Sequence, residues 1–411
     1  MSEQFDVVIV GGGIGGGALG AVLARAGKRV LVLEKTTEYR DRVRGEWIAP
    51  WGVAELQELG LYDAFIAAGA HHVSKHVSYG DGIDPAVAEA SALPLVDLLP
   101  GIPGPLCFGH PASCNLLHDT AVASGATVLR DVTDVTNVTF GASPSVTYVV
   151  GGNEYTATCK IVVGADGRGS LVRRAAGIEL HRDPTHHLFS GMLIEGADGW
   201  PEDVQMLGAE GDVHYLAFPQ GNGRVRLYLG YSSDQAQRLA GAGGQQAFLD
   251  AFRLKSVPLA GHLANGRPAG PCNSYPNEDS WTDEPYSEGM VLIGDAAGHN
   301  DPIIGQGLSI TYRDVRTVRG VLLAGDDWSP GAFVAYGEER RERMRRLRFV
   351  ATLQSLVENE FGAEAEERRR RVYERRAQDP VLMLPALATM LGPEKMPPAA
   401  FEDALMQRTL A

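Results

Sequence analysis

The chain has 411 residues, of which 44% are hydrophobic and 21% charged, and its formal net charge is -14 at pH 7. This length allows two or three domains, and the negative charge disfavours binding to nucleic acid. No apolar run reaches the roughly 18 residues of a membrane span, the first predicted strand at Phe5 leaves no room for a secretion signal, and the four cysteines show no C-x-x-C pairing. We therefore expect a reduced, cytoplasmic protein with neither a metal site nor a membrane partner.

The first predicted unit is a strand, a glycine-rich turn, a helix and a second strand. An almost continuous apolar run over residues 5–10 is typical of a buried parallel strand. The helix is predicted over residues 14–26 and the second strand over residues 29–33. Together they form a βαβ unit.

Three glycines in that unit fit the pattern G-x-G-x-x-G. Gly11 permits the turn, Gly13 lets a pyrophosphate approach the backbone, and Gly16 lets the helix pack close to the strand. The helix N-terminus offers N–H groups and a partial positive charge to phosphates. Glu34 ends the second strand, where its carboxylate can accept hydrogen bonds from a ribose. The unit predicts an ADP-containing dinucleotide but does not distinguish NAD from FAD.

A polar loop over residues 35–47 carries three arginines, Arg40, Arg42 and Arg44. Arginines beside a dinucleotide site can clamp phosphates through forked hydrogen bonds, and they can equally be solvated. Spacing alone leaves both interpretations open.

The next elements are predicted from periodicity and turn residues. They are a helix over 51–68, short strand-like pieces over 71–105, a helix over 112–124, a strand over 127–129, and a hairpin of 146–150 with 154–157.

A second informative stretch covers residues 159–173. An apolar strand runs into a glycine turn that carries Asp166, and Ser170 stands where it can cap a helix. An acid at the C-terminal end of a strand lies where open α/β sheets bind ligands. The alternative is an acid that only stabilises the turn.

Between residues 179 and 285 the apolar period shifts toward two. Strands are predicted over 188–195, 213–218 and 225–231. In the last of them Arg224, Arg226 and Tyr228 share one face, and Val225, Leu227 and Leu229 share the other. We expect one face to pack and the other to meet a ligand.

The third informative stretch, residues 290–309, has the same order of predicted elements as the first. An apolar strand ends at Asp295, a glycine-rich loop follows, and a helix is predicted to residue 323. Two anion-binding helix starts imply a long ligand between them. After residue 329 the chain is predicted to be helical, and its Arg- and Glu-rich segments at 338–348 and 363–377 are interpreted as solvated faces with ion pairs of about 0.3 to 0.5 kcal/mol each.

Together the three stretches resemble the group A flavoprotein monooxygenases, FAD enzymes built like para-hydroxybenzoate hydroxylase, over residues 5–325. The resemblance implies an α/β fold: a Rossmann-type, glutathione reductase-like FAD-binding domain, interleaved with a β-sheet substrate domain and followed by C-terminal helices. The implied divisions are 1–73, 101–180 and 286–328 for FAD, 74–100 and 181–285 for substrate, and 329–411 for the helices.

The resemblance also implies the residues that contact FAD. They are Gly11, Gly13, Ile14, Gly16, Glu34, Lys35, Arg42, Arg44, His110, Val132, Asp166, Gly294, Asp295, Pro302, Gly305, Gly307 and Leu308. Three positions depart from the family pattern: Gly298 replaces a histidine, with His299 displaced by one; Ser309 replaces an asparagine; and His110 replaces an arginine.

The implied activity is an NAD(P)H-consuming monooxygenase that delivers one oxygen atom of O2 to an aromatic, phenolic or heteroaromatic molecule through a flavin hydroperoxide. Candidate catalytic residues are Arg44, Arg226, Tyr228, His299 and Pro302, with His214 and Tyr215 as further candidates for a base that removes a phenol proton. Arg226 resembles a family position that senses flavin movement. The helical tail suggests a homodimer interface.

Three alternatives stay open. A flavin-dependent halogenase shares the first motif, but Trp47-Ile48-Ala49-Pro50-Trp51 does not fit its W-x-W-x-I-P signature. An FAD-dependent isoprenoid reductase would take up no oxygen. A non-catalytic dinucleotide-binding protein would not oxidise NAD(P)H with any ligand. The substrate, its site of oxygenation and the choice of NADH or NADPH are not determined by the sequence.

Overall fold

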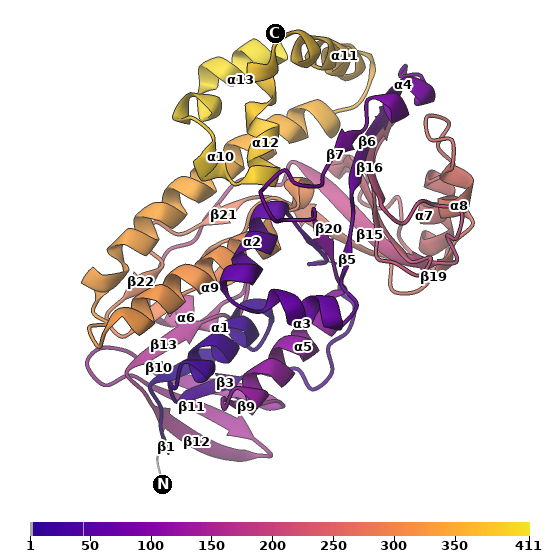
Figure 1. Ribbon diagram of the computed structural model, residues 1–411. Helices are drawn as coiled ribbons and strands as arrows, with labels where there is room; N and C mark the ends of the chain where they lie inside the picture. Colours follow the sequence, from indigo (N-terminus) through magenta and orange to yellow (C-terminus); the bar gives the residue numbers. More distant parts are fainter. Residues whose placement is uncertain (1–2, 44) are drawn as a thin grey trace.

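Five parallel strands and one antiparallel strand form the central sheet of the computed structural model, which describes residues 3–43 and 45–411 (Figure 1). The order is β22 (Tyr286–Ser287), β23 (Met290–Leu292), β13 (Ile161–Gly164), β2 (Val7–Val10), β3 (Val30–Leu33) and β9 (Thr127–Leu129). The strands of the three sequence motifs, β23, β13 and β2, are therefore direct neighbours. Because they are parallel, their glycine-rich ends meet at one edge of the sheet.

The central sheet lies between helices and a second sheet. Alternate residues of β2 and β3 point to opposite faces, since side chains alternate along a strand. Val7 and Ile9 join a core with α1 (Ile14–Arg25), α5 (His110–Ala123) and α9 (Gly307–Ala324), while Val8 and Val10 face the other side. That side is covered by β1 (Glu3–Gln4), β12 (Asn153–Thr158), β11 (Ser145–Val150) and β10 (Val132–Thr139). The predicted α/β fold is confirmed.

A separate eight-stranded sheet comes from the segments predicted to bind substrate. Its order is β19 (Arg267–Pro268), β15 (His187–Glu195), β18 (Val225–Ser232), β17 (Val213–Pro219), β16 (Val204–Glu210), β6 (Lys75–Gly80) and β7 (Leu93–Pro94), with β20 (Asn273–Asn277) beside β15. Strand β16 was not predicted, because its Gly208 and mixed polarity hide the period of two. The predicted domain boundaries stay predictions.

Two helix predictions differ from the structure. The single helix expected over 51–68 is two helices, α2 (Pro50–Glu58) and α3 (Tyr62–Ala67), because Gly60 adopts a φ of 62° that ends a helix. Helix α5 begins two residues early, with Pro111 in its first turn.

The C-terminal region contains α10 (Val334–Glu358), α11 (Ala363–Gln378), α12 (Leu384–Leu391) and α13 (Asp403–Leu410). Helix α10 runs beside α9, and α11, α12 and α13 gather at the top of the view (Figure 1). The interpretation of residues 338–348 as a solvated face was wrong, because Arg340 and Arg343 are only 2% and 3% exposed. Each bonds Asp314 of α9. Within the described residues, no helix combines the length and apolarity needed to cross a bilayer.

Candidate functional site

The first glycine motif forms an open turn at the start of α1. Gly11 has a φ of 97°, which favours glycine, and a Cβ on Gly16 would overlap the carbonyl oxygen of Gly11. A Cβ on Gly13, in contrast, would meet no atom within 4 Å, and α1 has no side-chain N-cap. The fold itself therefore requires Gly11 and Gly16, while Gly13 keeps space open over unpaired N–H groups.

The predicted ribose acid lies against this turn. The Glu34 carboxylate is 6% exposed and accepts hydrogen bonds from the N–H groups of Gly12 and Thr36, each at 2.7 Å. The Gly12 carbonyl accepts a hydrogen bond at 2.8 Å from Tyr39 Oη and also contacts His118. Tyr39 and His118, which no sequence motif marks, thus fix the turn on its other side.

Five other predicted cofactor residues follow the first motif in sequence, and those that the structure describes differ in exposure. Lys35 and Arg42 are exposed, and His110 begins α5 half-buried. Val132 is buried, and its N–H bonds the Glu34 carbonyl at 3.0 Å. Arg44 lies outside the described residues.

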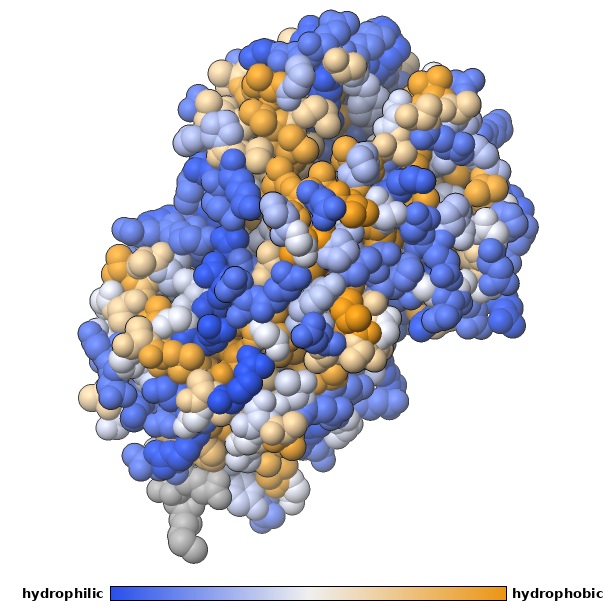
Figure 2. Space-filling model, viewed as in Figure 1, coloured by the Kyte–Doolittle hydropathy of each residue, from blue (hydrophilic) through white to orange (hydrophobic). Residues whose placement is uncertain are grey.

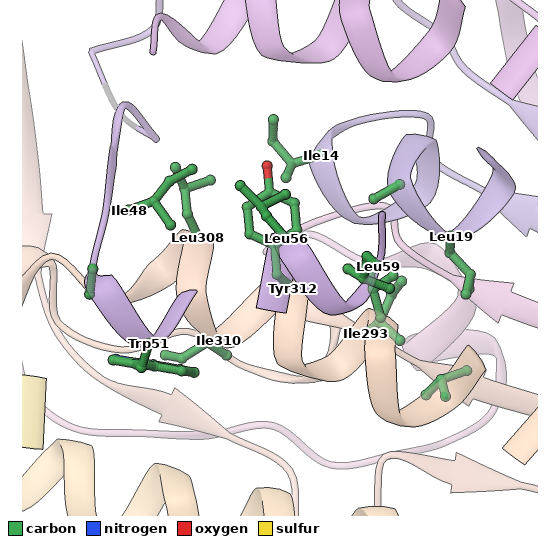
Figure 3. Close-up of a cluster of buried hydrophobic side chains, with 14 of the residues drawn as sticks. Ile14, Leu19, Ile48, Trp51, Leu56, Leu59, Ile293, Leu308, Ile310 and Tyr312 are labelled. Carbon is green, nitrogen blue, oxygen red and sulfur yellow. The ribbon is translucent and has the colours of Figure 1, made fainter. Parts of the chain in front are cut away.

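Ile14 and Leu308 belong to one buried apolar cluster (Figure 3). They occupy the first turns of α1 and α9, and the two helices pack against each other. Because both side chains pack into the cluster, a cofactor would contact these two positions through their backbone. The cluster also holds the N-termini of α1 and α9 side by side.

Asp166, in the second motif, has one bonded and one unbonded carboxylate oxygen. Its Oδ2 accepts from the N–H groups of Leu171 and Val172 at 2.6 and 3.2 Å, which caps α6 (Leu171–Ala175). The predicted cap Ser170 accepts from the N–H of Arg173. Asp166 Oδ1 is buried and has no hydrogen-bond partner. The acid stabilises the turn and keeps one oxygen for another donor.

The third motif forms two short helical turns before α9. They are η2 (Gly294–Ala297) and η3 (Pro302–Ile304), and Gly294 and Gly305 have positive φ. Arg340 donates to the carbonyls of Gly294, Ala297 and Gly298 at 3.1, 2.8 and 2.9 Å. A guanidinium from the C-terminal helices therefore shapes this loop, a role that the sequence pattern did not reveal.

Two observations show that this edge suits a dinucleotide. The N-termini of α1 and α9 lie on adjacent parts of the edge and lack side-chain caps, and a Cβ on Gly307 would meet nothing within 4 Å. Asp166 Oδ1 adds a buried acceptor with no donor. The arrangement offers N–H groups for phosphates at one end and carboxylate oxygens for hydroxyl groups, which is the polar chemistry of FAD.

The face of the eight-stranded sheet that adjoins this loop is aromatic. Ring centroids lie 5.9 Å apart for Trp47 and Phe218, 6.1 Å for Phe218 and Tyr228, and 6.4 Å for Tyr228 and Phe189. A Cβ on Gly305 would lie 3.1 Å from the Trp47 ring, which places this ring against the third-motif loop. The opposite face carries Val225, Leu227 and Leu229 in a separate core, so the predicted division of β18 is confirmed.

The predicted catalytic residues occupy different environments. Arg226 does not meet open space, because it is 1% exposed and paired with Glu46 and Asp41. Tyr215 lies on the opposite face, where its hydroxyl bonds Ser256 at 2.8 Å, and this removes it as a substrate base.

The remaining candidates lie on β17, on β18 and in the third-motif loop. Burial raises the pKa of Tyr228 well above its ordinary value. His299 is 4% exposed and its Nδ1 lies 2.6 Å from Ser280 Oγ. Pro302 is the first residue of η3. His214 of β17 is paired with Gly230, which follows Tyr228 by two residues on β18.

A profile of the family described as "FAD binding domain" matches residues 4–349. The chain belongs to this family of FAD-binding proteins. Its resemblance to the group A flavoprotein monooxygenases is thereby confirmed, and the protein is an FAD-dependent oxidoreductase of the monooxygenase family.

Similar proteins include enzymes of two kinds. Menaquinone reductase of Mycolicibacterium smegmatis is 27% identical over 387 residues, which are 87% of this chain and 87% of that protein. 3-Hydroxybenzoate 6-hydroxylase of Klebsiella oxytoca is 24% identical over 90% of this chain and 92% of its own length. The solved structure of p-nitrophenol 4-monooxygenase from Pseudomonas putida shares the fold of this flavoprotein with a TM-score of 0.76, at 18% identity and 98% coverage of both chains.

Proposed function

We propose that this flavoprotein uses NADPH or NADH to reduce FAD and inserts one oxygen atom of O2 into an aromatic small molecule. The observation that carries the proposal is the run of Trp47, Phe218, Tyr228 and Phe189 beside the third-motif loop. Aromatic side chains offer faces and edges to a ring ligand. The similarity to a hydroxybenzoate hydroxylase over nearly the whole of both chains supports the same substrate class.

FAD, when bound, supplies the electron transfer and the oxygen chemistry. The chain's own residues bind and orient it: the turn at Gly13 for the pyrophosphate, Glu34 for the ribose, and the backbone of the Pro302–Gly307 loop for the flavin ring. Trp47, packed against that loop, excludes water from the reacting side, which limits wasteful loss of reduced oxygen.

A second candidate is an FAD-dependent reductase of an isoprenoid quinone. It is favoured by the similarity to menaquinone reductase and by apolar surface where α12 meets β7 (Figure 2). Leu93 of β7 is 37% exposed, and Met390 of α12 packs with Trp47 and Phe218 against the cluster that contains Leu95, the residue after β7. An isoprenoid tail can follow such a surface toward the aromatic face. The predicted cytoplasmic location and homodimer stay predictions.

The visible spectrum of the purified protein tests the proposal. FAD-loaded protein receives NADPH or NADH without oxygen, then oxygen, with a panel of phenols and heteroaromatic acids and, separately, a soluble naphthoquinone. The expected result is faster bleaching with one ring compound, oxygen uptake, and a product heavier by one oxygen atom. Reduction of the quinone without oxygen uptake would instead favour the reductase, bromination in the presence of bromide the halogenase, and no NAD(P)H oxidation with any ligand a non-catalytic protein.

A further inference from the structure

The C-terminal end of α10 lies against the substrate sheet at the row that contains Phe189, the last ring of the aromatic run. Phe189, Gly230 and His214 are direct cross-strand partners on β15, β18 and β17, so their side chains share one face. A Cβ on Gly230 would overlap Asn359 Oδ1. The absence of a side chain at position 230 therefore lets the Asn359 amide lie directly on the strand, next to His214.

Buried polar atoms without hydrogen-bond partners gather at this point. They are His214 Nδ1, Glu358 Oε2, and both Nδ2 and Oδ1 of Asn359. The three residues are 1%, 1% and 4% exposed. An unpaired polar group in the interior is destabilising, so several together indicate a missing hydrogen-bond partner.

The hydrogen-bond donors and acceptors around these atoms indicate which kind of group would pair with them. Glu358 Oε1 accepts from the Tyr373 hydroxyl at 2.7 Å, and its Oε2 lies 3.9 Å from His214 Nδ1. Burial lowers the pKa of His214 to about 3, and a backbone hydrogen bond to Gly208 uses the other ring nitrogen. His214 is therefore neutral, and its Nδ1 is an acceptor. Glu358 Oε2 also lies 3.7 Å from Arg369 Nε, beyond hydrogen-bond distance, and burial raises the pKa of Glu358. Neither His214 Nδ1 nor Glu358 Oε2 therefore has a hydrogen-bonded donor, and both lie beside an amide that can donate and accept.

We propose that His214, Glu358 and Asn359 form the polar end of the substrate pocket and bind a hydroxyl group carried by the aromatic substrate. The hydroxyl donates to the Glu358 carboxylate or to His214 Nδ1 and accepts from Asn359 Nδ2. The ring of the substrate then lies toward Phe189, whose centroid is 6.0 Å from that of His214 and 6.4 Å from that of Tyr228. This inference rests on the proposed function, since it names the group by which that site recognises a phenol.

Two ring compounds that differ only in the group on one oxygen atom test the subsite through their binding affinities, without any catalytic turnover. FAD-loaded protein is titrated with 2-naphthol and with 2-methoxynaphthalene, which lacks the hydroxyl hydrogen, and binding is followed through the flavin spectrum. We expect wild-type protein to bind 2-naphthol at least tenfold more tightly, the order expected for a hydrogen bond to a charged group. Glu358→Gln should reduce the ratio of the two affinities several-fold. Gly230→Ala, which displaces the Asn359 amide, should do the same by a separate route.

Glu360→Gln is the matched control, since Glu360 is half-exposed and pairs with Arg368 at 2.6 Å instead of facing the gap. It should keep the wild-type ratio. An unchanged ratio in both Glu358→Gln and Gly230→Ala, with the flavin spectrum intact, would overturn the subsite, and so would wild-type protein that binds neither probe. The proposed function fails on a different result, the absence of oxygen transfer from NAD(P)H-reduced protein, so the two failures are distinguishable.

Discussion

Arg226 on β18 and Glu46 at the end of the 35–47 loop form a two-armed ion pair in which both side chains are almost completely buried, at 1% and 4% exposure. Asp41 of the same loop adds a third bond, at 2.6 Å, to the Arg226 guanidinium. Between these two acids, Val43 is fully buried against the substrate sheet at Gly191. The ion pair therefore fixes the arginine loop, which follows the dinucleotide unit, onto the strand that carries Tyr228.

Removing one partner of this pair should destabilise the protein strongly. Arg226→Met leaves Glu46 buried without its cation, and the expected loss is about 3 to 5 kcal/mol in the free energy of unfolding, measured in urea. Burial already raises the pKa of Glu46. Arg267→Met is the control, because its pair with Glu195, at 3.1 Å, is exposed and should contribute about 1 kcal/mol or less. A loss below 1 kcal/mol in Arg226→Met would contradict the buried pairing.

The two glycines of the first motif should respond differently to an added methyl group. Gly16→Ala places its Cβ on the Gly11 carbonyl and should lower stability with or without FAD. Gly13→Ala meets no protein atom and should leave the apoprotein as stable as wild type, while FAD affinity falls about tenfold or more because the methyl occupies the phosphate approach. Thermal unfolding of apoprotein and FAD titration measure the two effects. Gly320→Ala, also open within 4 Å, should keep wild-type FAD affinity.

The glycine-rich edge of the central sheet was predictable because its structural requirements are local. The turn at Gly11 and the close contact of the helix with the turn at Gly16 both require glycine, and the two positions lie within six residues of sequence. A buried parallel strand is recognised by its continuous apolar run. The alternation in β18 correctly assigned its two faces, but the burial of Arg226 depends on Glu46, which is 180 residues away. Periodicity carries no information about such partners.

The contribution of the C-terminal helices was not predictable for the same reason. Arg340 and the exposed Arg341 stand in one Arg- and Glu-rich run, and only the packing of α10 against the third-motif loop distinguishes them. Glu358 and Asn359 carry no motif at all. Only the packing of the end of α10 against Gly230 distinguishes them from other polar residues of the helix.

Arg340 should be required for both stability and cofactor binding. Its guanidinium binds three carbonyls of the third motif and Asp314 Oδ2 at 3.0 Å, so Arg340→Met leaves four acceptors without this donor. Burial alone would raise the pKa of Asp314, and Arg340 with Arg343 lowers it instead. We expect a loss of about 3 kcal/mol or more in urea unfolding and weaker FAD binding. Arg341→Met should change stability by about 0.5 kcal/mol or less. Equal effects in the two variants would contradict the assignment.

Asp301, directly before Pro302, should make the stability of the third-motif loop depend on pH. Its Oδ1 accepts from the N–H of Ile303 and from Asn277 Nδ2, at 2.9 and 2.8 Å. Burial raises the pKa of Asp301 from the ordinary 3.8 to about 7, against the opposing effect of these hydrogen bonds. Between these two values the folded protein holds a proton that the unfolded chain has lost. The stability contributed by neutral Asp301 is therefore complete below about pH 4 and disappears as the pH rises to 7.

Asp301→Asn keeps an accepting Oδ1 but cannot ionise, so it removes this dependence. From pH 4.5 to 7.5 we expect wild-type protein to lose stability relative to the variant, by an amount on the order of a few kcal/mol in urea unfolding. Glu342→Gln serves as the control, because hydrogen bonds from Arg345 and Arg346 lower the pKa of Glu342 to about 2, which places its folded-state titration below this window. The unfolded chain titrates only at the lower end of the window, so the difference from wild type should stay nearly constant, within about 0.5 kcal/mol. A constant difference for Asp301→Asn as well would mean that Asp301 is ionised in the folded protein, and that the loop before Pro302 is held by a charge instead of a neutral acid.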